Sequence, residues 1–163
     1  MGFRSATNDD WPGIWKVFAE VVGAGDTYAY PPDIAEDEAR ALWLHDGEGR
    51  RVTFVALDGS EVVGTAYMKP NAGGPGDHIA NAGWMIRPDQ AGRGIGRTFA
   101  EYVMERAREA SFLGMQFNGV VSTNERAIGL WESLGFEIVG TVPDAFRHPE
   151  AGLVPIHVMY RAL

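Results

Sequence analysis

The hydrophobic pattern of the chain switches between the period of a helix and that of a strand. In residues 8–22 and 34–44, apolar side chains recur three or four positions apart, which predicts two helices early in the chain. Asn8 or Asp9 is expected to cap the first helix, because a short polar side chain precedes its apolar face.

Most of the remaining chain has the pattern of strands separated by turns. Two runs rich in β-branched residues flank Asp58-Gly59-Ser60, which predicts a hairpin. Residues 143–153 are expected to form a long loop before the closing strand. The expected strands are 3–7, 51–57, 61–70, 78–86, 115–122, 136–142 and 154–163, and the later helices are about 95–110 and 124–135.

The element order predicted in this way is βααβββαβαββ. Hairpins in the first half favour antiparallel pairing, and the strand–helix–strand alternation in the second half adds some parallel pairing. The expected fold is α/β (mixed α+β), a mostly antiparallel twisted sheet of about seven strands flanked by about four helices. A length of 163 residues suits a single domain, 1–163.

Composition narrows the function classes. The chain has no cysteine, which excludes disulfides and thiolate chemistry, and cytoplasm is the default location. A net charge of −8 argues against a nucleic-acid partner. No apolar run is long enough for a membrane span, and none of the four histidines has metal-ligand spacing. Strand edges and the long last hairpin are compatible with a homodimer.

A glycine-rich segment, Gly92–Gly96, joins a strand-like run to a long amphipathic helix. Glycines let the backbone approach a ligand closely, and a helix N-terminus offers unpaired N–H groups and partial positive charge to a phosphate. Arg93 and Arg97 add local positive charge. The segment lacks the Gly-Lys-Ser/Thr of a Walker loop and the full dinucleotide fingerprint. The alternative is a turn that only reverses the chain.

Two ordered motifs carry a family resemblance. "IRPDQAGRGIGRTFAEYVMERA" followed by "VSTNERAIGLWESLGFEIVG" resembles the GNAT superfamily of acetyl-CoA-dependent N-acetyltransferases over nearly the whole chain. The family loop reads Arg/Gln-x-x-Gly-x-Gly/Ala, whereas this chain has Ala91 at the first position and Gln90 one residue early. With Ala91 in place of Arg or Gln, the loop lacks one polar side chain that could contact the ligand, but its backbone N–H groups can still bind a phosphate.

The resemblance implies acetyl-CoA as co-substrate and no metal. Its pyrophosphate would bind the N–H groups that begin the central helix, and its pantetheine arm would pair with the preceding strand like an added β-strand. Asn124 can reach the coenzyme or simply cap its own helix. The cofactor-binding residues implied are Trp84, Met85, Ile86, Gly92, Arg93, Gly94, Ile95, Gly96, Arg97, Thr98, Asn124 and Trp131.

The expected catalytic groups of the family are partly missing. Trp131 stands where many GNAT enzymes have a tyrosine acid, and residues 78–86 lack the frequent strand glutamate. Gly83 has two readings: a bulge whose unpaired N–H stabilises an oxyanion, or a glycine kept for packing under Trp131.

Asn81 and Asn118 are the candidate catalytic residues. Both sit inside strands, where asparagine is disfavoured, so each either satisfies backbone groups or faces the cleft and holds substrate or a water. "HIANAG" and "FNGVVSTN" are also similar to the fungal acetyltransferases of proline analogues such as azetidine-2-carboxylate, which implies that strand asparagines contact substrate.

Four further residues are candidates for the acceptor site. Tyr28 and Tyr30 lie between the first two helices and either contact substrate or pack a lid. Phe146 and His148 lie in the expected last loop, where His148 is either a base or simply exposed.

The predicted function is acetyl transfer from acetyl-CoA to a primary or secondary amine of a small molecule, an amino acid or analogue. The amine would attack the thioester directly. The alternatives are a non-catalytic acyl-CoA-binding or regulatory module, and an acetyltransferase of protein N-termini or lysines.

Overall fold

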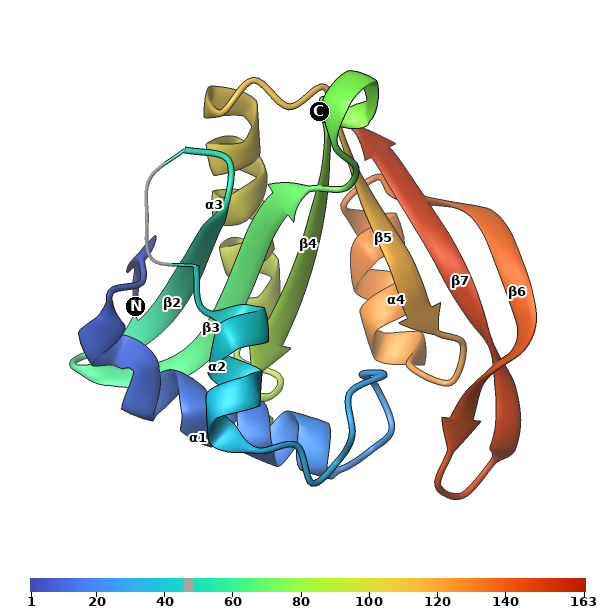
Figure 1. The fold of residues 1–163 in the computed structure, drawn as a ribbon, viewed down its shortest axis with the longest axis horizontal. Helices are drawn as coiled ribbons and strands as arrows, with labels where there is room; N and C mark the ends of the chain where they lie inside the picture. The colour runs from blue at the N-terminus through green and yellow to red at the C-terminus, as the bar shows by residue number, and fades with distance from the viewer. Residues whose placement is uncertain (46–48) are drawn as a thin grey trace.

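A computed structural model describes residues 1–45 and 49–163 of the chain. A seven-stranded sheet in the order β1-β2-β3-β4-β5-β7-β6 forms its centre (Figure 1). Neighbouring strands are antiparallel except β4 and β5, which are parallel. The elements are β1 (Gly2–Ser5), η1 (Asn8–Asp10), α1 (Trp11–Gly23), α2 (Glu36–Trp43), β2 (Val52–Asp58), β3 (Glu61–Pro70), η2 (Gly74–Gly76), β4 (Ile79–Ile86), η3 (Pro88–Gln90), α3 (Ile95–Glu109), β5 (Gly114–Val121), α4 (Glu125–Ser133), β6 (Glu137–His148) and β7 (Gly152–Ala162).

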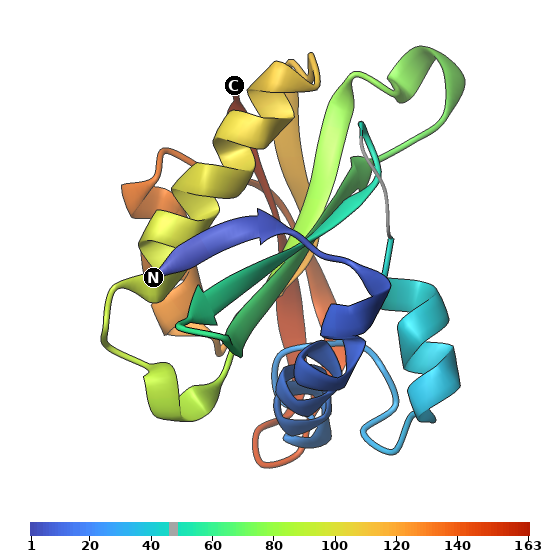
Figure 2. The ribbon, with the colours of Figure 1, turned by 90° about the vertical axis from the view of Figure 1, so that its left-hand side faces the viewer.

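The predicted fold class is confirmed in element order, in strand number and in the mixed pairing. The helices cover both faces of the sheet: α1 and α2 lie on one face, α3 and α4 on the other (Figures 1 and 2). None of the helices in the described ranges is long and apolar enough to cross a membrane.

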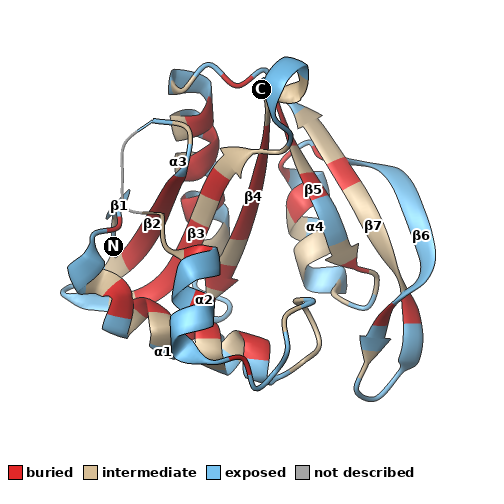
Figure 3. Cartoon of the chain, viewed as in Figure 1, coloured by how far each residue is buried: buried red, intermediate tan, exposed pale blue. Residues whose placement is uncertain are grey.

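Each face of the sheet has its own hydrophobic core. Figure 3 colours the buried residues of the strands and helices red. On the α3 and α4 face, Phe99 and Val103 of α3 pack against apolar side chains of the central strands. On the other face, Ile14 and Phe18 of α1 pack with Trp43 of α2, all fully buried. Burial of such side chains stabilises by roughly 1.5–3 kcal/mol each, so the central strands are fixed from both sides.

Two local predictions were wrong. The first helix does not begin at a cap on Asn8 or Asp9: Thr7 starts the turn η1, and α1 begins at Trp11. The reason is a capping box in which the Asp10 carboxylate accepts the Thr7 N–H at 2.7 Å.

The expected loop 143–153 is also not a loop. β6 continues to His148 and β7 starts at Gly152, so the segment forms the end of a long hairpin. Pro143 lies within a register shift between Val142 and Phe146, at the edge of the sheet. An edge strand accommodates proline at such an irregularity, because the ladder there does not need its N–H.

Candidate active site

A gap opens between β4 and β5 in the middle of the sheet. The two strands pair only from Ile79 with Gly114 to Asn81 with Gln116. Beyond that pair they diverge, and Figure 1 shows β5 leaning toward β7 while β4 stays with β3. We call the space beyond the Asn81–Gln116 pair the strand gap.

The backbone of Trp84 faces the strand gap. Arg87 N–H donates to Val63 O at 2.9 Å, and Asn71 N–H donates to Ile79 O at 2.8 Å. Residues of an antiparallel strand alternate between bonding to one neighbour and to the other. The odd-numbered positions of β4 therefore bond to β3, and Trp84 directs its N–H and C=O toward the side that β5 has left.

This alternation corrects the prediction for Gly83. The register between β3 and β4 is continuous, with Gly83 opposite Tyr67, so the predicted bulge is wrong. The backbone group that faces the strand gap belongs to Trp84 instead. Met85 likewise bonds toward β3, and its side chain is buried in the core under α1.

The alternative prediction, that Gly83 packs under Trp131, is also wrong, because other aromatic residues lie next to Gly83. A Cβ on Gly83 would lie 2.8 Å from Tyr67 Cε1 and 3.2 Å from the Tyr28 hydroxyl oxygen. Trp131 packs on the other face, with ring centroids 4.8 Å from Trp84 and 4.7 Å from Phe117. Gly83 therefore makes room for two tyrosines.

A cavity of about 330 Å³ occupies the strand gap and extends to the loop between α1 and α2. We call it the central cavity. It brings together most of the predicted catalytic and acceptor residues. Its lining includes Thr27, Tyr28, Tyr30, Tyr67, Asn81, Gly83, Trp84, Phe117, Asn118, Asn124 and Trp131.

Asn81 and Asn118 both line the central cavity, in different environments. Asn81 is buried: its side-chain oxygen accepts the Tyr67 hydroxyl at 2.9 Å, and its nitrogen donates to Gln116 O at 3.0 Å. Asn118 is exposed, accepts from the Gln116 side chain at 2.8 Å and donates to Asn71 at 2.7 Å. Asn81 thus joins β3, β4 and β5 where the strand gap begins, while Asn118 faces the opening.

Tyr28 and Tyr30 form one wall of the central cavity. Their rings stack with centroids 5.9 Å apart and planes 6° from parallel. The Tyr28 hydroxyl donates to Trp84 O at 2.8 Å, so it reaches the strand edge exposed by the gap. Burial raises the pKa of Tyr28 well above its ordinary value and also raises the pKa of Tyr30.

The lining of the central cavity is uncharged. Within the described ranges it contains no Asp, Glu, His, Lys or Arg side chain. The same residues contain no cluster of three or more His, Cys, Asp or Glu that could hold a metal ion. Two lining atoms, Trp84 Nε1 and Thr27 Oγ1, are buried without a hydrogen-bond partner among the described residues.

The predicted glycine cradle has an open face. Gly92 and Gly94 have φ angles of 84° and 77°, and a Cβ on either would point into open space. α3 begins at Ile95. The Thr98 N–H donates to Gly94 O, the carbonyl of the residue before the helix, at 3.3 Å. The N–H groups before Thr98 are those that a helix leaves unpaired. The geometry fits a phosphate group at this helix start.

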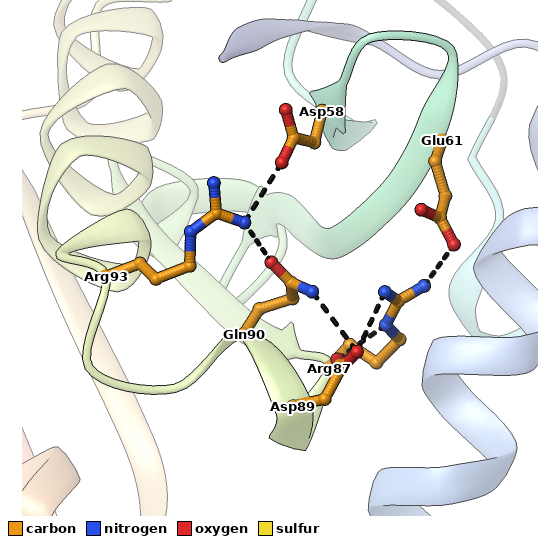
Figure 4. Close-up of polar contacts among 6 residues, drawn as sticks. All are labelled: Asp58, Glu61, Arg87, Asp89, Gln90 and Arg93. Carbon is orange, nitrogen blue, oxygen red and sulfur yellow. Dashed lines mark hydrogen bonds and ion pairs between the residues drawn. The ribbon is translucent and has the colours of Figure 1, made fainter.

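The two arginines of the cradle are held by neighbours. Arg93 bonds to Asp58 at 3.0 Å and to the Gln90 side chain, as Figure 4 shows. Arg97 donates to Ser133 Oγ at 2.6 Å. The Arg93–Asp58 pair is about half exposed on both sides. Such a pair contributes only about 0–1 kcal/mol, so Arg93 can exchange Asp58 for a phosphate with little loss.

Sequence reasoning missed the role of Arg87. Its guanidinium bonds to Asp89 at 2.6 and 2.9 Å and to Glu61 (Figure 4). These contacts tie the start of the cradle to the turn between β2 and β3. The sequence around Arg87 does not indicate the contact with Glu61, because the two residues are 26 positions apart in the chain.

The remaining predicted residues divide between the cavity and the hairpin. Asn124 caps α4, with its side-chain oxygen accepting the Ala127 N–H at 3.2 Å, and it also lines the cavity. Phe146 is buried in a small cluster with Val121 and Val154. Nδ1 of His148 accepts two N–H groups of the β6–β7 turn at 3.1 and 3.2 Å. In the described part of the chain, neither Phe146 nor His148 lines the central cavity.

Comparisons with known proteins agree with this architecture. The model of the acetyltransferase (GNAT) family matches residues 14–136. The structure of a GCN5-related N-acetyltransferase from Kribbella flavida is 45% identical, with a TM-score of 0.94 over 99% of this chain and 97% of that chain.

Two curated relatives carry specific names. The L-methionine sulfoximine/L-methionine sulfone acetyltransferase of Pseudomonas paraeruginosa is 34% identical over 152 residues, which cover 86% of this chain and 82% of that protein. N-acetyltransferase aca1 of Schizosaccharomyces pombe is 38% identical over 88 residues. That match spans 54% of this chain and 42% of the yeast protein, so the chain corresponds to less than half of that relative.

The chain belongs to the GNAT acetyltransferase family. At the level of the family, the predicted class of acetyl-CoA-dependent acyltransferase is confirmed.

Proposed function

We propose that the protein transfers an acetyl group from acetyl-CoA to the primary or secondary amine of a small molecule, an amino acid or an amino-acid analogue. One observation carries this proposal. The strand gap, toward which the backbone of Trp84 points, opens into an uncharged cavity of about 330 Å³ whose lining includes tyrosines and asparagines. That volume lies at the low end of small-molecule sites, which favours a small acceptor over a protein segment.

The cofactor side of the proposal uses the cradle and the strand gap. The N–H groups of Gly92 to Thr98 would hold the pyrophosphate of acetyl-CoA, and Arg93 and Arg97 would add charge. The pantetheine amides would pair with the free edge of β4 at Trp84 and Ile86, with Asn124 and Trp131 beside the arm.

The acceptor side uses Tyr28, Tyr30, Asn81 and Asn118. With no charged side chain in the described lining, a bound amine loses water without gaining an ion partner. Desolvation of this kind disfavours the ammonium form and favours the neutral, nucleophilic amine. The Pseudomonas relative, named for methionine sulfoximine and methionine sulfone, supports amino-acid analogues as the acceptor class.

In the reaction, the amine would attack the thioester carbonyl directly, which is the simplest route for a chain that has no cysteine to carry the acetyl group. The Trp84 N–H, which faces the strand gap, would donate to the developing oxyanion. One well-placed donor of this type contributes about 3–4 kcal/mol to catalysis.

The test is to incubate the protein with acetyl-CoA and an amine panel and to follow the release of free CoA thiol. The panel includes methionine sulfone, methionine sulfoximine, proline analogues and a peptide with a free N-terminus. We expect release above the hydrolysis background with at least one amino-acid analogue and none with the peptide. Tight acetyl-CoA binding with no release for any amine would favour a non-catalytic acyl-CoA-binding module, which the uncharged lining also allows. The cytoplasmic location stays a prediction.

A further inference from the structure

The proposed reaction needs a proton donor that the site does not obviously supply. When the amine displaces CoA, the departing sulfur carries a negative charge until a proton reaches it. Trp131, beside the strand gap, has only an indole N–H, which does not act as an acid. In the described lining, the groups that carry an ionisable proton are the hydroxyls of Tyr28, Tyr30 and Tyr67.

The contacts distinguish these three tyrosines. The Tyr67 hydroxyl proton is committed to the Asn81 side-chain oxygen at 2.9 Å, inside the network that joins β3, β4 and β5. The Tyr28 hydroxyl instead donates to Trp84 O at 2.8 Å, at the backbone edge exposed by the strand gap. Tyr30 stacks flat against the Tyr28 ring, and Trp43 meets that ring edge-on at 5.9 Å. Tyr28 is therefore the phenol held at the strand edge.

Gly83 makes this position of Tyr28 accessible. A Cβ at residue 83 would come within 3.2 Å of the Tyr28 hydroxyl oxygen and 2.8 Å of the Tyr67 ring. The missing side chain thus leaves space for the phenol directly beside β4. A ligand amide that pairs with Trp84 O would compete with the Tyr28 hydroxyl for this carbonyl, and the exchange would free the Tyr28 O–H for another acceptor in the gap.

We propose that Tyr28 protonates the sulfur that leaves during acetyl transfer, an inference that rests on the proposed function. The amine nitrogen forms the new C–N bond, the C–S bond breaks, and its electron pair stays on sulfur. The Tyr28 O–H proton moves to that sulfur and gives free CoA thiol. The phenolate then takes back the proton lost by the attacking nitrogen, through water, so one amide and one thiol are formed without a net change in charge.

Burial is consistent with this role. It raises the pKa of Tyr28, so the hydroxyl keeps its proton at neutral pH. A thiolate formed in the same water-poor space loses its hydration too, and this desolvation raises its own proton affinity.

The experiment compares Tyr28→Phe with Tyr30→Phe, a matched loss of one phenolic oxygen from the neighbouring ring. Each variant is assayed with acetyl-CoA and with an aryl thioester, whose thiolate is stable without a proton. With acetyl-CoA we expect Tyr28→Phe to lower kcat about 100-fold with KM within about threefold, as for loss of a general acid. With the aryl thioester we expect the loss in kcat/KM to shrink to about threefold. Tyr30→Phe should show the same modest effect with both donors.

Several outcomes would overturn the role of Tyr28. An equal loss with both donors would make it a positioning residue. If Tyr28→Phe has an unchanged kcat and binds acetyl-CoA more tightly, the Tyr28 hydroxyl only competes with the coenzyme for a hydrogen bond to Trp84 O. Silence of the wild type toward every amine would instead overturn the proposed function, and this proposal with it.

If Tyr28→Phe does not fold, 3,5-difluorotyrosine at position 28 keeps the hydroxyl and lowers its pKa. We then expect the high-pH limb of the kcat profile to move to lower pH, and an unmoved limb would count against the proposal.

Discussion

The two strand asparagines differ at the level of single hydrogen bonds. Asn81 is 6% exposed and holds both the Tyr67 hydroxyl and the Gln116 carbonyl, whereas Asn118 is exposed and bonds to other amide side chains. Leaving a buried polar group without a partner costs about 1–3 kcal/mol. A change at an exposed position costs within about 0.5 kcal/mol.

We therefore expect Asn81→Ala to lower the free energy of unfolding by about 1–3 kcal/mol. We expect Asn118→Ala to leave stability nearly unchanged and to raise the acceptor KM about tenfold, since one lost hydrogen bond is worth about 1.4 kcal/mol. Urea unfolding measures the first effect and CoA-release kinetics the second. Equal destabilisation by both variants would contradict the distinction.

Much at the residue scale was visible in the sequence. An asparagine inside a strand indicates a special environment, and Asn81, Asn118, Tyr28 and Tyr30 do meet in one cavity. The direction in which each backbone group points was not visible, because it depends on the phase of the β3–β4 ladder. A sequence shows that Gly83 is unusual, but only the register shows that Trp84 faces the gap.

At the scale of elements, the turn into α3 depends on left-handed glycines. Gly94 has φ 77° and Gly152, in the β6–β7 turn, has φ 74°, and a Cβ on either would meet open space. Alanine in this conformation costs roughly 1–2 kcal/mol. Both Gly94→Ala and Gly152→Ala should therefore destabilise the chain by a similar amount.

Only Gly94→Ala should weaken CoA binding, by tenfold or more, because its Cβ would project where the backbone must meet a phosphate. Isothermal titration with CoA measures this difference. A similar affinity loss in Gly152→Ala would mean that general destabilisation, and not the cradle, sets the affinity.

The start of α1 carries a pH-dependent contact. Arg4 bonds to both oxygens of Asp10 at 2.7 and 2.8 Å, and this hydrogen bonding, together with the Thr7 N–H, lowers the Asp10 pKa from 3.8 to about 2. A depressed folded-state pKa contributes stability above the unfolded pKa, and that stability is lost as the pH falls toward the folded one.

We expect Asp10→Asn to lower Tm at pH 6 and the difference from wild type to close between pH 4 and 2. Thermal unfolding followed by circular dichroism across this range checks it, with the neighbouring Asp9→Asn as control. A gap in Tm that stays constant down to pH 2 would rule out this contact as its source.

For the whole molecule, the period of the hydrophobic pattern was enough to predict the order of elements, since each helix and strand has one face in a core. The strand gap could not be predicted, because it depends on where β5 stops pairing with β4 and turns to β7. Residues 143–153 were misread for a related reason. Their two prolines and one glycine are typical of loops, and only pairing with a partner strand shows that these residues form a hairpin.

That hairpin carries the last prediction. β6 is the edge of the sheet, and it exposes Ile138, Val139 and Val142 to between 41% and 58%, with Leu153 of β7 at 52%. An edge strand with exposed apolar side chains is a surface for pairing with another chain. We therefore expect a homodimer through β6, with a mass in light scattering near twice 17.8 kDa. Val139→Lys should shift the mass toward the monomer, because a lysine ammonium at the interface must be desolvated. Leu42→Lys, at a 44% exposed apolar residue of α2 across the molecule, should leave the mass unchanged. A monomeric wild type, or a dimer that Leu42→Lys disrupts and Val139→Lys does not, would place the interface elsewhere or remove it.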